Sequence, residues 1–213
     1  MLKFALACEG ITDQIVIENI LCGFYKDYDD LDEDIQAFQP LYDATGQKQV
    51  EDEFGGWEML LQYLSEKRFR ENVLNTKYMI IQIDTDISEH KNFGVMKQGL
   101  STVELIEQVI DRLVTQIDKK KEFYEQNKHK IIFAISVHSL ECWILPLYKN
   151  FKSEKITGCF ESLQRESKKI DVLKNHDTYN KLTKNFLKYK KLMPIVSKNT
   201  SFDIFIKSLP KEI

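Results

Sequence analysis

The sequence predicts an α/β protein with a mostly parallel sheet flanked by helices, and three observations lead to this prediction. Short apolar runs at 2–8, 78–83 and 131–137 have the composition of strands buried on both faces. Segments of helical period lie between them, and this alternation favours a parallel sheet with right-handed crossovers. An acidic residue follows each run closely, so we expect carboxylates at one edge of the sheet.

The first strand runs directly into a helix. Glu9 and Gly10 follow the strand, and Gly10 permits a tight turn. We expect Thr12 to cap the helix and Asp13 to lie favourably in its first turn, against the helix dipole. Because Asp13 already fills the role of a helix-start charge, Glu9 is available for another function.

Two weaker signals follow in the first half of the chain. Residues 35–42 are predicted to form a second strand, interrupted at Pro40. Gly55 and Gly56 open a helix, and a glycine pair there is a weak signal for phosphate binding.

The second half begins with a well-marked helix. Ser101 and Glu104 form a capping box, and an apolar stripe of helical period follows as far as Ile117. After the 131–137 strand, the residues from 149 read as short lysine-rich helices. We therefore expect a catalytic domain at 1–148 and a helical basic extension at 149–213 packed on it.

The stretch 78–86 carries the clearest chemical signal. Its apolar strand ends in Asp84 and Asp86, and two unpaired carboxylates this close are costly to bury. Mg²⁺ or Mn²⁺ would remove that cost, since hard cations prefer carboxylate oxygen. Glu9 and Glu141 follow the other strands, so these four acids are predicted to form one metal site. The competing interpretation is a solvated turn after each strand.

Composition excludes several classes of protein. No apolar run approaches the length of a membrane span and no signal peptide opens the sequence, so we expect a cytoplasmic protein without membrane contact. The cysteines and histidines lack metal-ligand spacing, which argues against a zinc site or a disulfide framework. We expect the four cysteines to act as small buried hydrophobic residues: Cys8, Cys22, Cys142 and Cys159.

The charge is distributed unevenly. The net charge is -3, but residues 1–118 hold 10 Lys and Arg against 23 Asp and Glu, whereas residues 119–213 hold 20 against 10. A basic half suggests a polyanionic partner, and a merely solvated basic surface is the alternative. On one predicted continuous helix, the densest basic group is the candidate nucleic-acid surface: Lys181, Lys184, Lys188, Lys190 and Lys191.

The acidic motifs resemble those of a known fold. The run Glu9-Gly10-Ile11-Thr12-Asp13 after one strand, and Asp84-Thr85-Asp86 after a later one, look like the Toprim fold, which is Rossmann-like. That fold is shared by topoisomerases, bacterial primases, recombination-mediator proteins and the overcoming-lysogenization-defect (OLD) nucleases. Residues 139–145 and 199–205 resemble small stand-alone bacterial Toprim proteins, some of whose relatives belong to phage-defence systems.

The resemblance implies a metal-dependent nuclease acting on DNA or RNA. The family's Glu and DxD motif carry over to Glu9, Asp84 and Asp86, as catalytic residues and metal ligands, with Glu141 completing the metal shell. A protein partner within a defence system is a further implication. The sequence does not identify the basic residue that would neutralise transition-state charge; Lys91 and Lys97 are candidates.

Other functions remain open at this point. A Toprim-fold subunit that binds nucleic acid without cutting it, and that acts with a partner, fits the same motifs. Residues 84–88 also resemble the first motif of haloacid-dehalogenase-like phosphatases, although their expected later acidic pair is replaced by Glu141 alone. Glycosyltransferases use a DxD motif as well, but no other sequence feature supports a sugar-nucleotide site.

Overall fold

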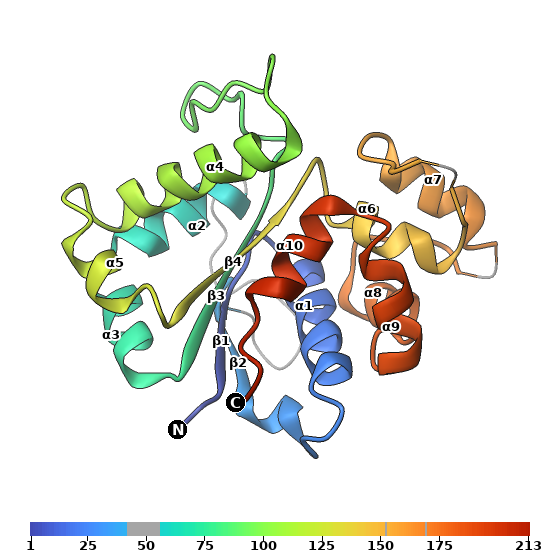
Figure 1. The fold of residues 1–213 in the computed structure, drawn as a ribbon, viewed down its shortest axis with the longest axis horizontal. Coiled ribbons are helices and arrows are strands. Elements are labelled where there is room, and N and C mark those ends of the chain that lie inside the picture. Colours follow the sequence, from blue (N-terminus) through green and yellow to red (C-terminus); the bar gives the residue numbers. More distant parts are fainter. Residues whose placement is uncertain (42–55, 152, 169) are drawn as a thin grey trace.

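Four parallel strands form the centre of the molecule, in the order β2-β1-β3-β4 (Figure 1). The architecture is described by a computed structural model over residues 1–41, 56–151, 153–168 and 170–213. The prediction of a parallel sheet flanked by helices is confirmed. The strands are β1 (Phe4–Ala7), β2 (Ile35–Gln39), β3 (Tyr78–Asp84) and β4 (Ile131–Ser136).

Helices cover both faces of the sheet, as Figure 1 shows. One face carries α2 (Gly56–Ser65), α3 (Lys67–Asn75), α4 (Thr102–Ile117) and α5 (Glu122–Asn127). The other face carries α1 (Ile11–Phe24), α6 (Glu141–Ile144), α7 (Cys159–Glu166), α8 (His176–Thr183), α9 (Tyr189–Val196) and α10 (Thr200–Ser208). Two short 3₁₀ helices, at Leu31–Asp34 and Leu145–Leu147, complete the described elements.

Burial on both faces explains why each run is mostly apolar. In β1, Phe4 and Leu6 join the core beneath α1, whereas Ala5 and Ala7 face the helices of the opposite layer. All four side chains are inaccessible to solvent or nearly so. A strand covered on both faces has no solvent side, so its sequence contains no polar alternation.

The helix starts agree only in part with the sequence prediction. The capping box of Ser101 and Glu104 is present at the start of α4, as predicted. The prediction for Thr12 is wrong, because Gly10 is the N-cap of α1 and no side chain caps that end. Thr12 lies inside the helix, because the chain turns at Gly10 and the helix begins at Ile11. The predicted strand at 35–42 ends at Gln39, and its last residue lies outside the described residues.

A disulfide bond contradicts the prediction for two of the cysteines. Cys142 in α6 and Cys159 in α7 are bonded, with their Cα atoms 5.1 Å apart. Their separation of 17 residues gave no sign of this, because the pairing depends on how α6 and α7 pack together. Cys8 is a buried free thiol as predicted, and Cys22 is half-buried.

The predicted single lysine face is also wrong. Lys181 lies in α8 and Lys191 in α9, while Lys184 and Lys188 lie in the turn between these helices. The turn brings the fully buried Phe186 against α1. Its backbone approaches so closely that a Cβ at Gly23 would stand 1.7 Å from the carbonyl oxygen of Phe186. Packing on α1 therefore breaks the helix and separates the lysines.

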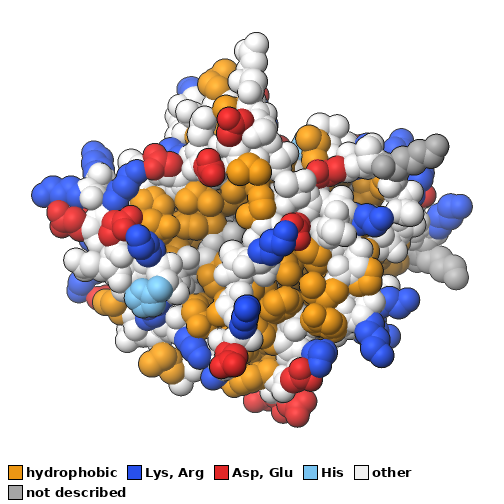
Figure 2. All heavy atoms as spheres, in the orientation of Figure 1, with side chains coloured by type: hydrophobic (Ala, Val, Ile, Leu, Met, Phe, Trp, Pro, Cys, Tyr) orange, Lys and Arg blue, Asp and Glu red, His pale blue; other side chains and the backbone are white. Residues whose placement is uncertain are grey.

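The edge strand β4 lies between α4 and α10. Apolar side chains gather on this face, as Figure 2 shows, and Ile110, Phe133 and Ile204 are among those that line a groove there. Among the described residues, no helix combines the length and the apolar character that crossing a membrane requires.

Candidate active site

A cleft of about 530 Å³ opens at the carboxyl ends of the strands. Its lining includes the four acidic residues that the sequence analysis singled out, from the ends of β1 and β3 and from the helix α6 after β4: Glu9, Asp84, Asp86 and Glu141. Parallel pairing explains why they meet, since β1 and β4 flank β3 and all three strands end at the same edge.

Asp84 is held by side chains from the sheet itself. The Ser136 hydroxyl donates to Asp84 Oδ1 at 2.5 Å, and Gln82 Nε2 donates to the same oxygen at 3.0 Å. Both donors are fully buried, so they fix the orientation of this carboxylate. Asp86, two residues further on, is exposed in the open part of the cleft.

Glu9 is tied to the same strand end. Its backbone N–H donates to Gln82 Oε1 at 3.2 Å, and its carboxylate Oε2 accepts from the backbone N–H of Asp84 at 3.3 Å. Gln82 therefore bonds to both acids at once. One buried amide thus fixes the spacing between the ends of β1 and β3.

Glu141 reaches the cleft from the first turn of α6. Its side chain is buried, and Oε1 accepts a hydrogen bond from the Tyr179 hydroxyl of α8. Burial and the adjacent carboxylate raise the pKa of Tyr179, so the phenol stays protonated and continues to donate. The helix α8 is in this way a structural support of the cleft.

The loop after β4 is strained where it passes the DxD motif. His138 has a positive φ of 67°, in the left-handed region that a residue with a Cβ seldom adopts. Its backbone N–H donates to Thr85 Oγ1 at 2.8 Å, and its carbonyl accepts from the backbone N–H of Asp86 at 3.0 Å. These bonds hold the loop against Asp86 and offset the conformational cost.

The carboxylates disfavour one another's ionised forms. Burial, opposed by the bond from the Asp84 backbone and reinforced by the charge of Asp86, raises the pKa of Glu9 from 4.5 to about 7. Burial and neighbouring acids likewise raise the pKa of Asp84 and the pKa of Asp13 well above the ordinary value for aspartate. The cleft therefore holds more negative charge than its surroundings stabilise.

Two charged residues of the cleft were not predicted. Asp13, interpreted from the sequence as a helix-start charge, lines the cleft one helical turn after Gly10. Its position four residues after Glu9 in the sequence could have indicated that the two carboxylates lie close together. Lys174, in the loop before α8, also lines the cleft and is close enough to lower the pKa of Glu9. No sequence pattern marked it, because its place depends on tertiary packing.

Gly56 has a steric role beside the first acid. A Cβ built on it would stand 2.3 Å from the carbonyl oxygen of Glu9, so only glycine permits α2 to begin here. Its predicted partner, Gly55, lies outside the described residues. Of the two predicted lysines, Lys97 donates to the backbone carbonyl of Asp86 at 3.0 Å, and Lys91 is exposed.

The donor chemistry of the cleft fits a hard divalent cation. Its acids offer carboxylate oxygens, which Mg²⁺ and Mn²⁺ prefer, and their raised pKa values indicate that positive charge is lacking. Within the part of the chain that the structure describes, no group of three or more His, Cys, Asp or Glu side chains is arranged to hold an ion as it stands. Metal binding therefore requires the side chains to draw together.

Comparison with known proteins returns no match for this chain among protein-family models, curated proteins or solved structures. The Toprim resemblance thus depends on the motifs and their place at the strand ends, and it stays a prediction.

Proposed function

We propose that the chain is a Toprim-like enzyme that hydrolyses phosphodiester bonds of nucleic acid with the help of Mg²⁺ or Mn²⁺. The observation that carries this proposal is the convergence of acids from the ends of β1 and β3 and from the helix α6 after β4 in one open cleft. An electronegative cleft repels phosphate unless cations neutralise it, and a bound divalent ion does so while drawing the substrate in.

The roles of the side chains follow from their surroundings. Asp84 and Asp86 would hold the ion with Glu9, and Glu141 would complete the set. When bound, the ion would polarise the phosphoryl oxygen and lower the pKa of a bound water. Asp84 keeps a fixed orientation through its bonds to Ser136 and Gln82, which favours a constant geometry through turnover.

Two further groups act on the substrate in this proposal. Glu9 lies beside Asp84 at the end of β1, so its carboxylate can either hold the ion or accept a proton from the attacking water. Lys174, at the rim of the cleft, places an ammonium group where charge develops on the phosphoryl oxygens. In this proposal Lys174, rather than Lys91 or Lys97, is the basic residue that neutralises transition-state charge.

The test is cleavage by the purified protein. Labelled single- and double-stranded DNA and RNA, with bis(p-nitrophenyl) phosphate as a small diester, are incubated with Mg²⁺ or Mn²⁺. We expect cleavage that Asp84→Asn abolishes, because this variant removes a ligand of the ion. Asp29→Asn, which alters an exposed acid outside the cleft, is the matched control and should keep full activity.

The same assay separates the competing functions. Hydrolysis of p-nitrophenyl phosphate without diester cleavage would indicate a phosphatase, and nucleic-acid binding without hydrolysis of either ester would indicate a binding subunit. A wild-type protein that cleaves no diester with either metal overturns the proposal.

A further inference from the structure

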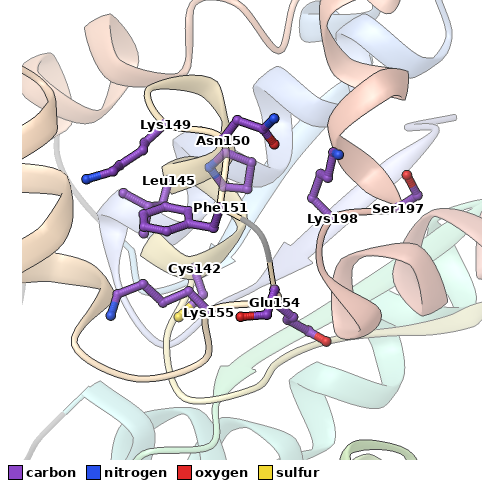
Figure 3. A pocket seen from close by; sticks show the side chains of 11 residues that line it. Cys142, Leu145, Lys149, Asn150, Phe151, Glu154, Lys155, Ser197 and Lys198 are labelled. Carbon is purple, nitrogen blue, oxygen red and sulfur yellow. The ribbon is translucent and has the colours of Figure 1, made fainter.

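A second cavity, of about 200 Å³, lies beside Cys142 of the disulfide bond, and three lysines are among the residues that line it (Figure 3). We call it the lysine cavity and define it by Lys149, Lys155 and Lys198, with Phe151, Glu154 and Cys142. It belongs to the chain after α6 and to the loop before α10, so it is separate from the strand ends that form the acidic cleft.

Among the described residues, Glu154 is the one acid that lines the lysine cavity, and it is already bonded. The carboxylate of Glu154 accepts from the backbone N–H and from the hydroxyl of Thr200, each at 2.7 Å, at the start of α10. These bonds hold the carboxylate at the positive end of the helix α10. Three lysines against one acid leave a positive excess among the described lining residues.

The lysines differ in their pairing. Lys149 forms an ion pair of 2.5 Å with Glu166, outside the cavity lining. Lys155 and Lys198 have no ion pair with any residue that the structure describes. Ammonium groups without a fixed partner are available to an anion at little cost.

An aromatic ring lies between two of these lysines. Figure 3 shows Phe151 between Lys149 and Lys155, whose side chains extend to the same side of the ring. The ammonium of Lys149 lies over the ring, 5.4 Å from its centre, and Phe151 is only partly buried, so a base that stacks on this face would displace the ammonium toward its phosphate. An aromatic face flanked by cations is the arrangement that holds a base and its phosphates in single-stranded nucleic acid.

The lysine cavity adjoins the acidic cleft. Cys142 lines the cavity and its bonded partner Cys159 lines the cleft, so the disulfide forms part of both walls. The ammonium of Lys155 stands 4.0 Å from where a Cβ of Gly158 would lie, and Gly158 lines the cleft. The carboxylate of Glu161, which also lines the cleft, lies 3.7 Å from the same position, so the two sites meet where a lysine and an acid lie side by side.

We propose that the lysine cavity binds one nucleotide of a single-stranded nucleic acid whose adjoining phosphodiester lies in the acidic cleft. Phe151 stacks on the base, and Lys149, Lys155 and Lys198 neutralise the phosphates. The volume of about 200 Å³ lies below the usual range of ligand pockets, so the cavity has room for at most one nucleotide and not for a duplex. This inference rests on the proposed function and names the substrate that the cleft acts on.

The lysines around α8 and α9 provide the competing surface. Figure 1 shows α7 and α9 at opposite ends of the right-hand group of helices, with α7 at the end near the carboxyl termini of the strands. Lys184, Lys188 and Lys191 are exposed there, but none of them lines the cleft or the lysine cavity. Replacing these three lysines is therefore the matched control for replacing the three lysines of the lysine cavity.

The experiment measures binding of a fluorescein-labelled twelve-residue oligodeoxythymidylate by anisotropy, without divalent cations so that no cleavage occurs. The variant Lys149→Gln/Lys155→Gln/Lys198→Gln should bind at least tenfold more weakly at low salt. Its slope of log K against log salt should flatten by about 2, at about 0.7 per phosphate contact on single strands. Lys184→Gln/Lys188→Gln/Lys191→Gln should change the affinity less than threefold.

Two further variants keep the outcome interpretable. Lys155→Gln/Lys198→Gln leaves the ion pair of Lys149 with Glu166 intact and should still weaken binding, so a folding defect cannot account for the loss. Phe151→Ala should weaken binding by roughly 5- to 150-fold without changing the salt slope, since stacking involves no counterion release.

The outcomes separate the alternatives. Equal losses in both lysine triple variants, or no loss in the first, would overturn the lysine cavity as the binding site. Thymidine monophosphate binding as tightly as the oligonucleotide would overturn a strand as the ligand in favour of a free nucleotide. Hydrolysis of bis(p-nitrophenyl) phosphate tests the cleft alone: it should survive in the cavity variants, and its absence in the wild type overturns only the proposed function.

Discussion

The acidic cleft and the lysine cavity share one disulfide but are built in opposite ways. The acids of the cleft are attached to strand ends and the first turns of helices, and buried donors such as Ser136 and Gln82 fix Asp84. The lysines of the cavity lie in loops, and two of them have no fixed partner among the described residues.

This difference indicates a division of labour. Carboxylates held close together repel one another, and a bound cation would remove this repulsion. Side chains fixed by buried donors suit a site that needs a constant geometry. Flexible, solvated lysines adapt to a chain of phosphates without fixing its sequence. In this interpretation the cleft performs the reaction and the cavity holds the strand.

Breaking the shared disulfide is expected to have the largest effect on stability. The bond closes a loop of 17 residues, and constraining such a loop in the unfolded chain stabilises the fold by about 3 kcal/mol. Cys142→Ser/Cys159→Ser should therefore lower the free energy of unfolding in urea by that amount. Oligonucleotide binding and diester hydrolysis should both weaken, since the bond is part of both walls.

The control for this prediction is Cys22→Ser. Cys22 is a free, half-buried thiol outside both walls, so its replacement should affect neither function. If the double serine variant unfolds at the same urea concentration as the oxidised wild type, the disulfide does not stabilise the fold.

The pH dependence of stability should reveal the charge imbalance of the cleft. In the folded protein Glu9 keeps its proton up to a pKa of about 7, whereas in the unfolded chain it loses the proton near 4.5. The folded state thus binds more protons between these values, so stability without metal should fall as pH rises from 4.5 to 7. The contribution of Glu9 is at most about 3 kcal/mol.

Glu9→Gln is the variant that checks this prediction. Urea unfolding in EDTA at pH 4.5, 6 and 8 should show a smaller loss of stability than in the wild type. Part of the slope should remain, because the pKa values of Asp13 and Asp84 are also raised. Mg²⁺ should stabilise the wild type more at pH 8 than at pH 5. A wild-type stability that rises between pH 4.5 and 7 would contradict the assigned imbalance.

The sequence predicted one region far better than the other, for a physical reason. Glu9 and Asp84 directly follow apolar runs, and parallel strands end at one edge of the sheet. The local sequence pattern was therefore sufficient to predict that these two residues lie close together. The lysine cavity has no such rule. Phe151 and Lys198 are far apart in sequence, and only the packing of the helical layer brings them to one cavity.

Tertiary packing also explains the failed predictions. The lysines after Tyr179 had acceptable helical spacing, but burial of Phe186 against Gly23 requires a turn there. The bond between Cys142 and Cys159 likewise depends on the contact of two short helices, which the hydrophobic periodicity of the sequence does not predict.

The smallest expected effect concerns the link between α8 and the cleft. Tyr179→Phe removes the hydroxyl that donates to Glu141 Oε1 and leaves that buried oxygen without this donor. Losing a hydrogen bond to a buried acceptor costs about 1–2 kcal/mol, so the urea midpoint should fall modestly. The freed Glu141 side chain should also hold its orientation less well, which weakens the stabilisation that Mn²⁺ gives to the folded protein.

Comparison with a second tyrosine shows whether this effect is specific to the cleft. The Tyr148 hydroxyl donates to the backbone carbonyl of Leu182 at 2.7 Å, away from the acids, so Tyr148→Phe should lower stability without changing the response to Mn²⁺. Oligonucleotide binding without metal should be unaffected by Tyr179→Phe, because Tyr179 lies outside the lysine cavity. If Tyr179→Phe leaves the Mn²⁺ response intact, Glu141 does not serve the metal site, and the cleft reduces to Glu9, Asp84 and Asp86 as ligands.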